Sequence, residues 1–168
     1  MISAVEIKKL LRLEPHPREG GWFRQTWKSE EEIPQKVLPS RYPGPRAAGT
    51  AIYYLLEPDT YSEMHRLASD EVFHFYLGDP VEMLQLYPDG SGRVLLLGSN
   101  PAAGMELQTV VPQGVWQGSR LLPGGQLALL GCTVSPGFDY QDYESGVRTE
   151  LVRGWAEWRE MITSLTRG

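Results

Sequence analysis

The sequence has little cysteine, no excess of basic residues and no long apolar segment. Cys132 is the single cysteine, so no intramolecular disulfide can form, which favours a cytoplasmic location. The 16 lysines and arginines are outnumbered by 21 aspartates and glutamates, which argues against binding to a nucleic-acid phosphate backbone. The longest apolar run, around Leu127–Leu130, is far too short to span a membrane.

What is present is the composition of an ordinary globular protein. Hydrophobic residues make up 41% and charged residues 22% of the 168 positions, enough to bury a real core. No repeat or linker divides the chain, so we expect one domain over residues 1–168. Residues Met1–Leu13 alternate charges with aliphatic side chains and do not resemble a signal peptide.

Short helices are expected at both ends of the chain. Ser3 and Glu6 have the spacing of a capping box, and Pro15 and Pro17 should end the first helix. The apolar stripe of that helix consists of Val5, Ile7, Leu10 and Leu11. Spacings of four and three residues predict a second helix, with the apolar positions Leu151, Trp155, Trp158, Ile162 and Leu165.

Segments typical of β-strands fill the middle of the sequence. The aromatic run Trp22–Trp27 predicts a strand. The proline-rich segment Pro34–Pro45 predicts a loop that serves as a lid or a surface arm. Regularly spaced strands with turns between them indicate a sandwich or a barrel. The main further strands are Thr50–Leu56, Val72–Leu77, Val81–Tyr87, Val94–Leu97, Leu107–Val111 and Leu127–Val134.

Two stretches of the sequence resemble the paired motifs of the cupin superfamily. In cupins the first motif has two histidines one residue apart, then a glutamate, then a glycine. Here His65, Glu71 and Gly78 match it, whereas Leu67 occupies the place of the second histidine. In the second motif a histidine follows a proline and a glycine, and Gln117 stands at its position.

The resemblance is closest to the small cupins of a domain-of-unknown-function family, and it covers nearly the whole chain. It implies an all-β cupin jelly-roll (double-stranded β-helix) barrel with short terminal helices, usually a homodimer. The family is similar in shape to sugar-nucleotide epimerases but has no agreed activity. The segments that carry the resemblance are Pro15–Gly21, Ala51–Leu56, Ser69–Phe75, Pro112–Gln117 and Gly131–Asp139.

The motif positions argue against a resident metal. A metal-binding cupin normally supplies three histidines and a carboxylate, a set that suits first-row transition metals. Leu67 and Gln117 replace two of these ligands, so His65, Glu71 and Gln117 would form only an incomplete shell. Strand alternation places His74 on the face opposite Glu71. We therefore expect no metal and no other cofactor.

Without a metal, His65 and Glu71 are the candidate catalytic residues. A histidine beside a carboxylate can act as a general base. The alternative is a buried hydrogen-bonded pair without any chemistry. The candidate ligand-binding residues are polar or aromatic. Pairing with a surface acid is an equally ordinary role for an arginine, and aromatic side chains are more often packed in the core. The candidates are Arg24, Tyr53, Tyr54, Trp116 and Gln117.

Two other features have a structural interpretation. Cys132 lies in an apolar run, which predicts an inert buried thiol. The acidic and aromatic segment Asp139–Glu144 predicts either a solvated turn or a cover over the mouth of the barrel.

The sequence favours a protein that binds a small polar ligand, carbohydrate-like or nucleotide-sugar-like, with metal-independent isomerase or epimerase chemistry. In that chemistry His65 removes a proton next to a carbonyl, Arg24 or Gln117 steadies the enolate oxygen, and Tyr53 or Tyr54 returns the proton. The same pocket also suits a non-catalytic binding or sensory module. A third reading is a metal-dependent dioxygenase-like cupin. The expected partners are this ligand and a second copy of the chain, paired through the strand at Trp22–Trp27, with no nucleic acid and no membrane.

Overall fold

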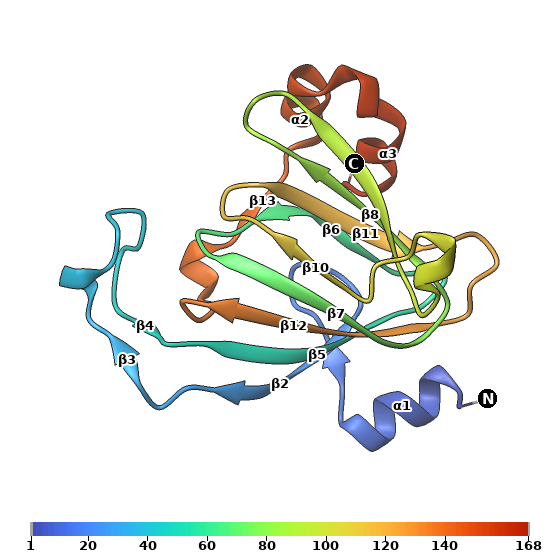
Figure 1. The fold of residues 1–168 in the computed structure, drawn as a ribbon, viewed down its shortest axis with the longest axis horizontal. Coiled ribbons are helices and arrows are strands. Elements are labelled where there is room, and N and C mark those ends of the chain that lie inside the picture. The colour runs from blue at the N-terminus through green and yellow to red at the C-terminus, as the bar shows by residue number, and fades with distance from the viewer. Residues whose placement is uncertain (1, 168) are drawn as a thin grey trace.

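The computed structural model describes residues 2–167 as two facing β-sheets with helices at both ends of the chain (Figure 1). The helices are α1 (Ala4–Leu11), α2 (Arg148–Gly154) and α3 (Arg159–Ser164). The strands are β1 (Glu14–Pro15), β2 (Trp22–Lys28), β3 (Glu32–Ile33), β4 (Arg46–Ala47), β5 (Thr50–Leu56), β6 (Tyr61–Arg66), β7 (Asp70–Gly78), β8 (Val81–Leu86), β9 (Gly92–Leu97), β10 (Gln108–Val111), β11 (Trp116–Leu121), β12 (Ala128–Ser135) and β13 (Glu144–Ser145).

From β5 onward the chain crosses between the two sheets after every strand except at the β8–β9 hairpin, which gives the barrel its jelly-roll connectivity. The first sheet has the order β1-β2-β5-β12-β7-β10, and the second has the order β13-β6-β11-β8-β9. All of the ladders within them are antiparallel. The prediction of an all-β jelly-roll barrel flanked by short helices is therefore confirmed.

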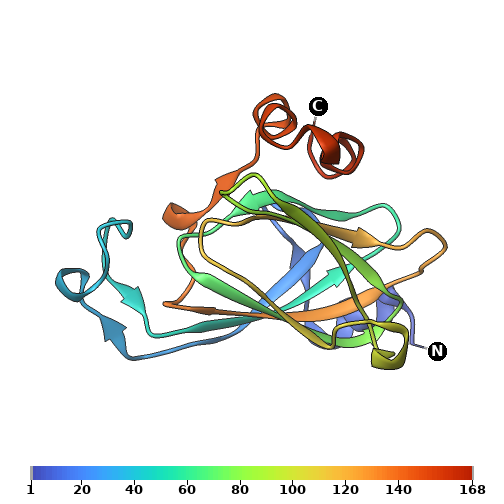
Figure 2. The ribbon, with the colours of Figure 1, turned by 45° about the horizontal axis from the view of Figure 1, so that its top comes forward.

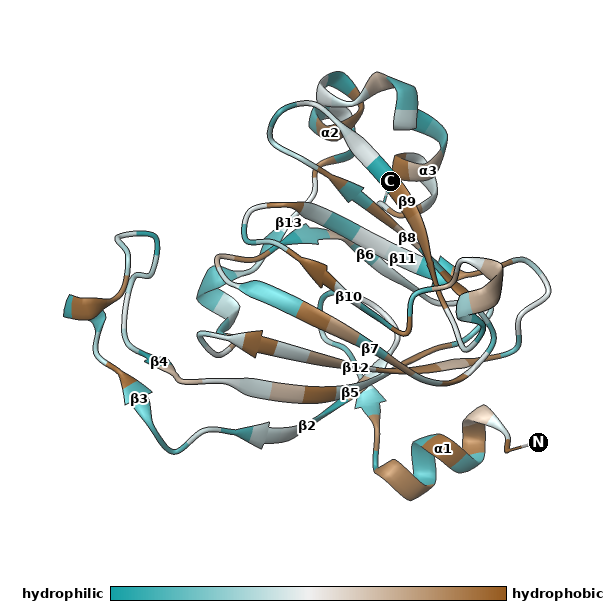
Figure 3. Ribbon diagram, in the orientation of Figure 1, coloured by the Kyte–Doolittle hydropathy of each residue, from teal (hydrophilic) through white to brown (hydrophobic). Residues whose placement is uncertain are grey.

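The main core lies between the two sheets and follows from strand alternation. In β7 the side chains of Glu71, Phe73 and Phe75 are buried, whereas those between them are half-buried or exposed. Apolar residues at alternate positions of β9 and β12 join the same core, together with Val111 of β10, and Figure 3 shows hydrophobic stretches on these strands. The expected phase of β7 is confirmed, because His74 lies on the outer face and bonds Thr133 and Gln108 there.

The N-terminal helix differs from the prediction in its buried face. The capping box of Ser3 and Glu6 is present, but Val5 and Leu10 are 70% and 69% exposed, and Ile7 is the buried residue of α1. The expected stripe is therefore right for Ile7 and Leu11, which pack against the first sheet, and wrong for Val5 and Leu10, because the helix lies against the outside of that sheet and buries only a narrow strip. A left-handed Arg12 ends the helix before either proline.

The C-terminal helical segment packs on the outer face of the second sheet. Trp155 and a 3-10 turn interrupt it, so the predicted single helix is two short ones, α2 and α3 (Figure 2). Leu151, Ile162 and Leu165 pack with Trp116 of β11 in a second apolar cluster. No helix within residues 2–167 combines the length and the apolar composition needed to cross a membrane.

The proline-rich segment forms an arm that extends from the barrel beside β2 and β5 (Figure 1). Strands β3 and β4 form a small two-stranded sheet in it. Two buried contacts tie the arm to the barrel. The hydroxyl of Tyr42 bonds the Ala68 carbonyl at 3.0 Å, and Arg46 forms a buried ion pair with Asp142 at 2.6 Å. Of the two predicted roles, the structure is that of a surface arm.

Candidate functional site

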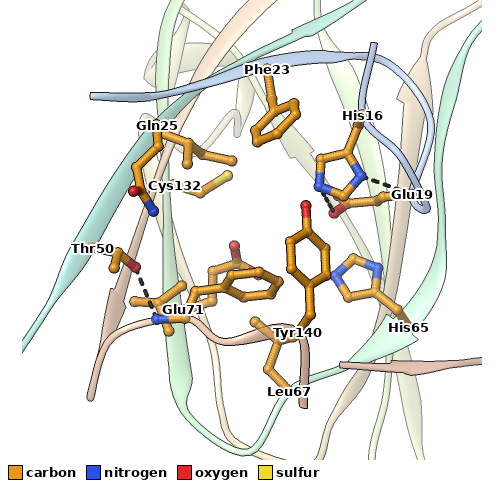
Figure 4. A pocket seen from close by; sticks show the side chains of 13 residues that line it. His16, Glu19, Phe23, Gln25, Thr50, His65, Leu67, Glu71, Cys132 and Tyr140 are labelled. Atoms are coloured by element: carbon orange, nitrogen blue, oxygen red, sulfur yellow. Dashed lines mark hydrogen bonds and ion pairs between the residues drawn. The ribbon is translucent and has the colours of Figure 1, made fainter. Parts of the chain in front are cut away.

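A cavity of about 80 Å³ lies at one end of the barrel, between the inner faces of the strands and two loops (Figure 4). Two motif residues contribute to it, together with side chains that come from the loop before β2 and from the segment after β12. The lining residues are His16, Glu19, Phe23, Gln25, Thr50, Ile52, His65, Leu67, Glu71, Cys132, Val134, Phe138 and Tyr140.

His16 is held in one tautomer by the loop that carries it. Its Nδ1 accepts a hydrogen bond from the backbone N–H of Glu19 at 2.9 Å, so in the neutral ring the proton resides on Nε2. Burial lowers the pKa of His16, while Glu19 opposes this shift. Nε2 lies 3.6 Å from Oε2 of Glu19, and the two side chains are 4% and 12% exposed.

His65, on β6, has the complementary arrangement. Its Nδ1 lies 2.6 Å from the backbone carbonyl of Glu63, which can only accept, so Nδ1 carries the proton of the neutral ring. The imidazole stacks on Tyr143 with ring centroids 4.9 Å apart. The lone pair of Nε2 is therefore the basic group that His65 presents at the cavity wall.

Glu71, on β7, is a buried carboxyl group with an unusually weak acidity. Nε2 of Gln117 donates a hydrogen bond to Oε2 of Glu71 at 2.5 Å, and the thiol of Cys132 bonds the same carboxyl group. Burial raises the pKa of Glu71 to about 7, although His65, Gln117 and Cys132 oppose the shift. Close to neutral pH this group therefore exchanges between an acid that can donate a proton and a base that can accept one.

The rest of the wall is apolar and uncharged. Phe23, Ile52 and Val134 contribute side chains to it, and no lysine or arginine is among the described residues that line the cavity. Tyr140 is one of the lining side chains labelled in Figure 4, and the guanidinium of Arg18 lies 5.4 Å from the centre of its ring. The cavity itself thus offers imidazoles, carboxyl groups and neutral polar groups, but no cation to hold a phosphate.

Comparison with known proteins identifies the family. A family model described as "Cupin superfamily (DUF985)" matches residues 6–146. The chain belongs to this cupin family. An uncharacterized protein of Saccharomyces cerevisiae is 31% identical over 134 residues, which are 75% of this chain and 67% of the yeast protein.

Two solved structures resemble this DUF985 cupin over its whole length. A hypothetical protein from Leishmania major has a TM-score of 0.89 at 30% identity, covering 99% of this chain and 100% of that one. A Shewanella oneidensis protein has a TM-score of 0.86 at 32% identity, covering 99% of each chain. The yeast and Leishmania proteins are described only as uncharacterized or hypothetical, so the likeness establishes the family and the fold but no activity.

The side chains of this cupin do not fit the metal site found in other members of the superfamily. Leu67 lines the cavity at one ligand position, and Gln117 at another donates its amide to Glu71. No three histidine, cysteine, aspartate or glutamate side chains within residues 2–167 lie close enough together to share a metal ion. The dioxygenase-like reading therefore lacks a ligand set in this structure.

The structure brings the three motif residues together. His65 and Glu71 line one cavity, and Gln117 stands directly opposite His65 in the pairing of β11 with β6. His65 and Glu71 each hydrogen-bond a different partner, Glu63 and Gln117 respectively. All three side chains are buried inside the barrel, but Gln117 is not among the residues that line the cavity, so its expected contact with the ligand is not supported. The catalytic role of His65 and Glu71 remains a prediction.

The expected placement of Arg24, Tyr53 and Trp116 at the ligand is wrong. Phe23 and Gln25 line the cavity, so Arg24 between them points to the outer face of β2, with its guanidinium 5.7 Å from the Tyr53 ring. Trp116 lies in the cluster under the C-terminal helices. These three residues cannot contact a ligand in this cavity, and none can steady an enolate or return a proton there.

Tyr54 points into the barrel but has a structural partner. Its hydroxyl donates to the carbonyl of Gly20 at 2.8 Å, and burial holds its pKa well above 10. Tyr54 does not line the cavity. It fixes the loop that carries Glu19, so its predicted part in proton return is not supported by its position.

Several cavity residues were not expected from the sequence. His16 and Glu19 lie within Pro15–Gly21, a segment that carries the family resemblance. That resemblance could have drawn attention to them, but it does not say what either side chain does. Tyr140 belongs to the acidic and aromatic segment, which closes the mouth of the barrel as one of the two readings anticipated. Cys132 is buried, and burial raises its pKa well above 9, so it is the inert thiol predicted, although it also lines the cavity.

Proposed function

We propose that this cupin binds a small, uncharged carbonyl compound in the cavity and moves a proton on it, as a metal-independent isomerase or epimerase. The observation that supports this proposal best is the pairing of two proton-transfer groups at one cavity. His65 presents a free Nε2 lone pair, and Glu71 has a pKa raised to about 7. Together they supply a base and an acid at neutral pH.

In the proposed reaction His65 takes a proton from the carbon next to the substrate carbonyl. The electrons of the broken C–H bond form the carbon–carbon double bond of an enol, while Glu71 transfers its proton to the carbonyl oxygen. The proton then returns to the former carbonyl carbon, while the hydroxyl on the neighbouring carbon gives its proton to Glu71 and becomes the new carbonyl, which gives the isomeric carbonyl compound. Return of a proton to the opposite face of the first carbon, with the enol proton going back to Glu71, gives the epimer. No electrons leave or enter overall, so the reaction needs no oxidant or reductant.

The size of the cavity favours a compound of few heavy atoms. At about 80 Å³ it is well below the roughly 300–1,000 Å³ of pockets that enclose drug-sized ligands. A complete nucleotide sugar therefore does not match this cavity, whereas a short carbohydrate-like aldehyde or ketone does.

Proton exchange in D2O tests the proposal directly. Hydroxyacetone, dihydroxyacetone and glyceraldehyde are incubated with the protein, and proton NMR follows the loss of signal at the carbon beside the carbonyl. The variant His65→Asn keeps an N–H that can donate to the Glu63 carbonyl but has no basic nitrogen. We expect it to lower exchange by about 100-fold or more, the usual contribution of a general base.

The matched control is His74→Asn, because His74 lies on the outer face and bonds Thr133 and Gln108. This variant should exchange protons as fast as the unmodified protein. If no substrate exchanges, or if exchange persists in His65→Asn, the proposed chemistry is wrong. Native mass spectrometry showing a retained metabolite, without exchange of any carbonyl compound, would instead identify a non-catalytic binding protein.

A further inference from the structure

His16 and Glu19 form a pair of polar atoms whose roles are fixed by the surrounding backbone. Because Nδ1 of His16 accepts from the Glu19 backbone N–H, Nε2–H must be a donor. Oε1 of Glu19 accepts from the Ser62 hydroxyl at 2.6 Å, which leaves Oε2 as a free acceptor. The donor Nε2 and the acceptor Oε2 therefore stand side by side at the cavity wall.

The two atoms do not satisfy each other. They are 3.6 Å apart, which is longer than a hydrogen bond between nitrogen and oxygen. Neither has another hydrogen-bond partner in the geometry of residues 2–167. A donor and an acceptor without hydrogen-bond partners in a nearly enclosed site are unfavourable, and a bound polar group can satisfy both.

We propose that His16 and Glu19 form a subsite that recognises a hydroxyl group of the ligand. A hydroxyl oxygen can lie about 2.7–2.9 Å from both atoms at once, accepting from Nε2–H of His16 and donating to Oε2 of Glu19. A methyl group satisfies neither atom, and a carboxylate or phosphate has no proton to donate to Glu19. The preferred ligand is therefore an uncharged hydroxy-carbonyl compound.

This inference deepens the proposed function and rests on it, since the subsite lies in the cavity that contains His65 and Glu71. The charges around the cavity support the ligand class independently. No lysine or arginine is among its described lining residues, so an anionic ligand would find no compensating cation there.

Comparing the binding of two compounds of the same size distinguishes recognition of a hydroxyl group from simple filling of the cavity. Hydroxyacetone carries a hydroxyl where 2-butanone carries a methyl group. Ligand-observed NMR titration should give at least about tenfold tighter binding for hydroxyacetone, because the hydroxyl bonds a charged acceptor that 2-butanone leaves unpaired. Dihydroxyacetone phosphate should bind at least about tenfold more weakly than dihydroxyacetone.

Two variants remove one partner each and preserve the loop. In His16→Asn the amide oxygen can replace Nδ1 as acceptor for the backbone N–H, while the Nε2 donor is lost. In Glu19→Gln the amide oxygen can still accept from Ser62, while the negative charge is lost. Each should reduce the preference for hydroxyacetone to within about threefold, with binding of 2-butanone unchanged. The control variant His74→Asn should keep the full preference.

The outcomes separate this inference from the proposed reaction. Equal binding of the two compounds, a preference that survives in both variants, or no binding of hydroxyacetone would overturn the hydroxyl subsite. Proton exchange that depends on His65 would still stand as evidence for the reaction in those cases. Conversely, hydroxyl preference that depends on His16 and Glu19, without any proton exchange, would support the subsite and reject the reaction.

Discussion

Replacement of Glu71 by glutamine should change how the stability of the protein depends on pH. Glu71 is 6% exposed and its pKa is raised from 4.5 to about 7, with burial as the largest cause. Glutamine has the shape of the protonated side chain and can still accept from Gln117, but it cannot ionise. The variant therefore removes one titration while it preserves the packing and the hydrogen bond.

The direction of the effect follows from the raised pKa. Below pH 4.5 Glu71 is protonated in both the folded and the unfolded chain, so its ionisation costs nothing. Between pH 4.5 and 7 the unfolded chain releases this proton and the folded chain retains it, so the free energy of unfolding falls as the pH rises. Above pH 7 the full cost of a buried carboxylate is present.

A shift of about 2.5 pKa units corresponds to about 3 kcal/mol. Relative to Glu71→Gln, the unmodified protein should therefore lose about 3 kcal/mol of stability between pH 4 and pH 8. Urea unfolding at fixed protein concentration, followed by the fluorescence of the five tryptophans, measures both proteins at each pH. The remaining carboxyl groups are common to the two proteins, so most of their effects cancel in the difference.

A difference in stability that stays constant from pH 4 to pH 8 would refute the reasoning, because Glu71 would then titrate as it does in the unfolded chain. A difference of opposite sign would show that the native site stabilises the carboxylate. Either result would also contradict the role of Glu71 as the acid in the proposed reaction. Glu82→Gln is the matched control for replacing one glutamate by glutamine, since Glu82 pairs with Arg120 at 2.6 Å and does not line the cavity.

Two further predictions concern metal content and assembly. Protein purified without added metal should hold well under one equivalent of zinc, iron, manganese or nickel, and elemental analysis that finds stoichiometric metal after dialysis would contradict this. The chain should be a homodimer, because β1 pairs with only Trp22 and Phe23 of β2 and leaves the rest of that edge, with a 51% exposed Trp27, open. Light scattering should give the dimer mass at micromolar concentration, and a monomer mass would count against it.

The motif residues could be placed from the sequence because they lie on regular strands. Alternation along β7 separates Glu71 from His74, and the register of β11 with β6 sets Gln117 against His65. Within an antiparallel ladder, residues that face each other share one side of the sheet. Once the family resemblance assigned the three residues to the paired motifs, their position inside the barrel followed.

Alternation alone does not predict which side chains of β2 face the inside of the barrel. Trp22, Phe23 and Trp27 put aromatic side chains on both faces of the strand, because α1 covers its outer face and the cavity lies on its inner face. A shift of one residue exchanges the two faces. The sequence therefore left open whether Arg24 faces a ligand or the surface, and the structure places it outside beside Tyr53.

The loop residues of the cavity have no periodicity from which to predict their direction. His16 and Glu19 reach the cavity because the chain turns at Gly20 and Gly21, whose φ values are 98° and 67°, conformations that favour glycine. The hydroxyl of Tyr54 holds that turn through the Gly20 carbonyl. The contact joins positions 34 residues apart, so it becomes visible only in the folded protein.

Burial shifts the pKa values of Glu71 and His16 in opposite directions, and both shifts favour the neutral form of the side chain. It lowers the pKa of His16 and raises the pKa of Glu71 to about 7, because a low-dielectric site disfavours whichever form is charged. Near neutral pH His16 therefore keeps Nε2–H as a donor, and a large share of Glu71 carries an O–H. Neutral donors beside the free lone pair of His65 suit a ligand that contains a carbonyl and a hydroxyl. A strongly anionic ligand would find no opposite charge among the described lining residues.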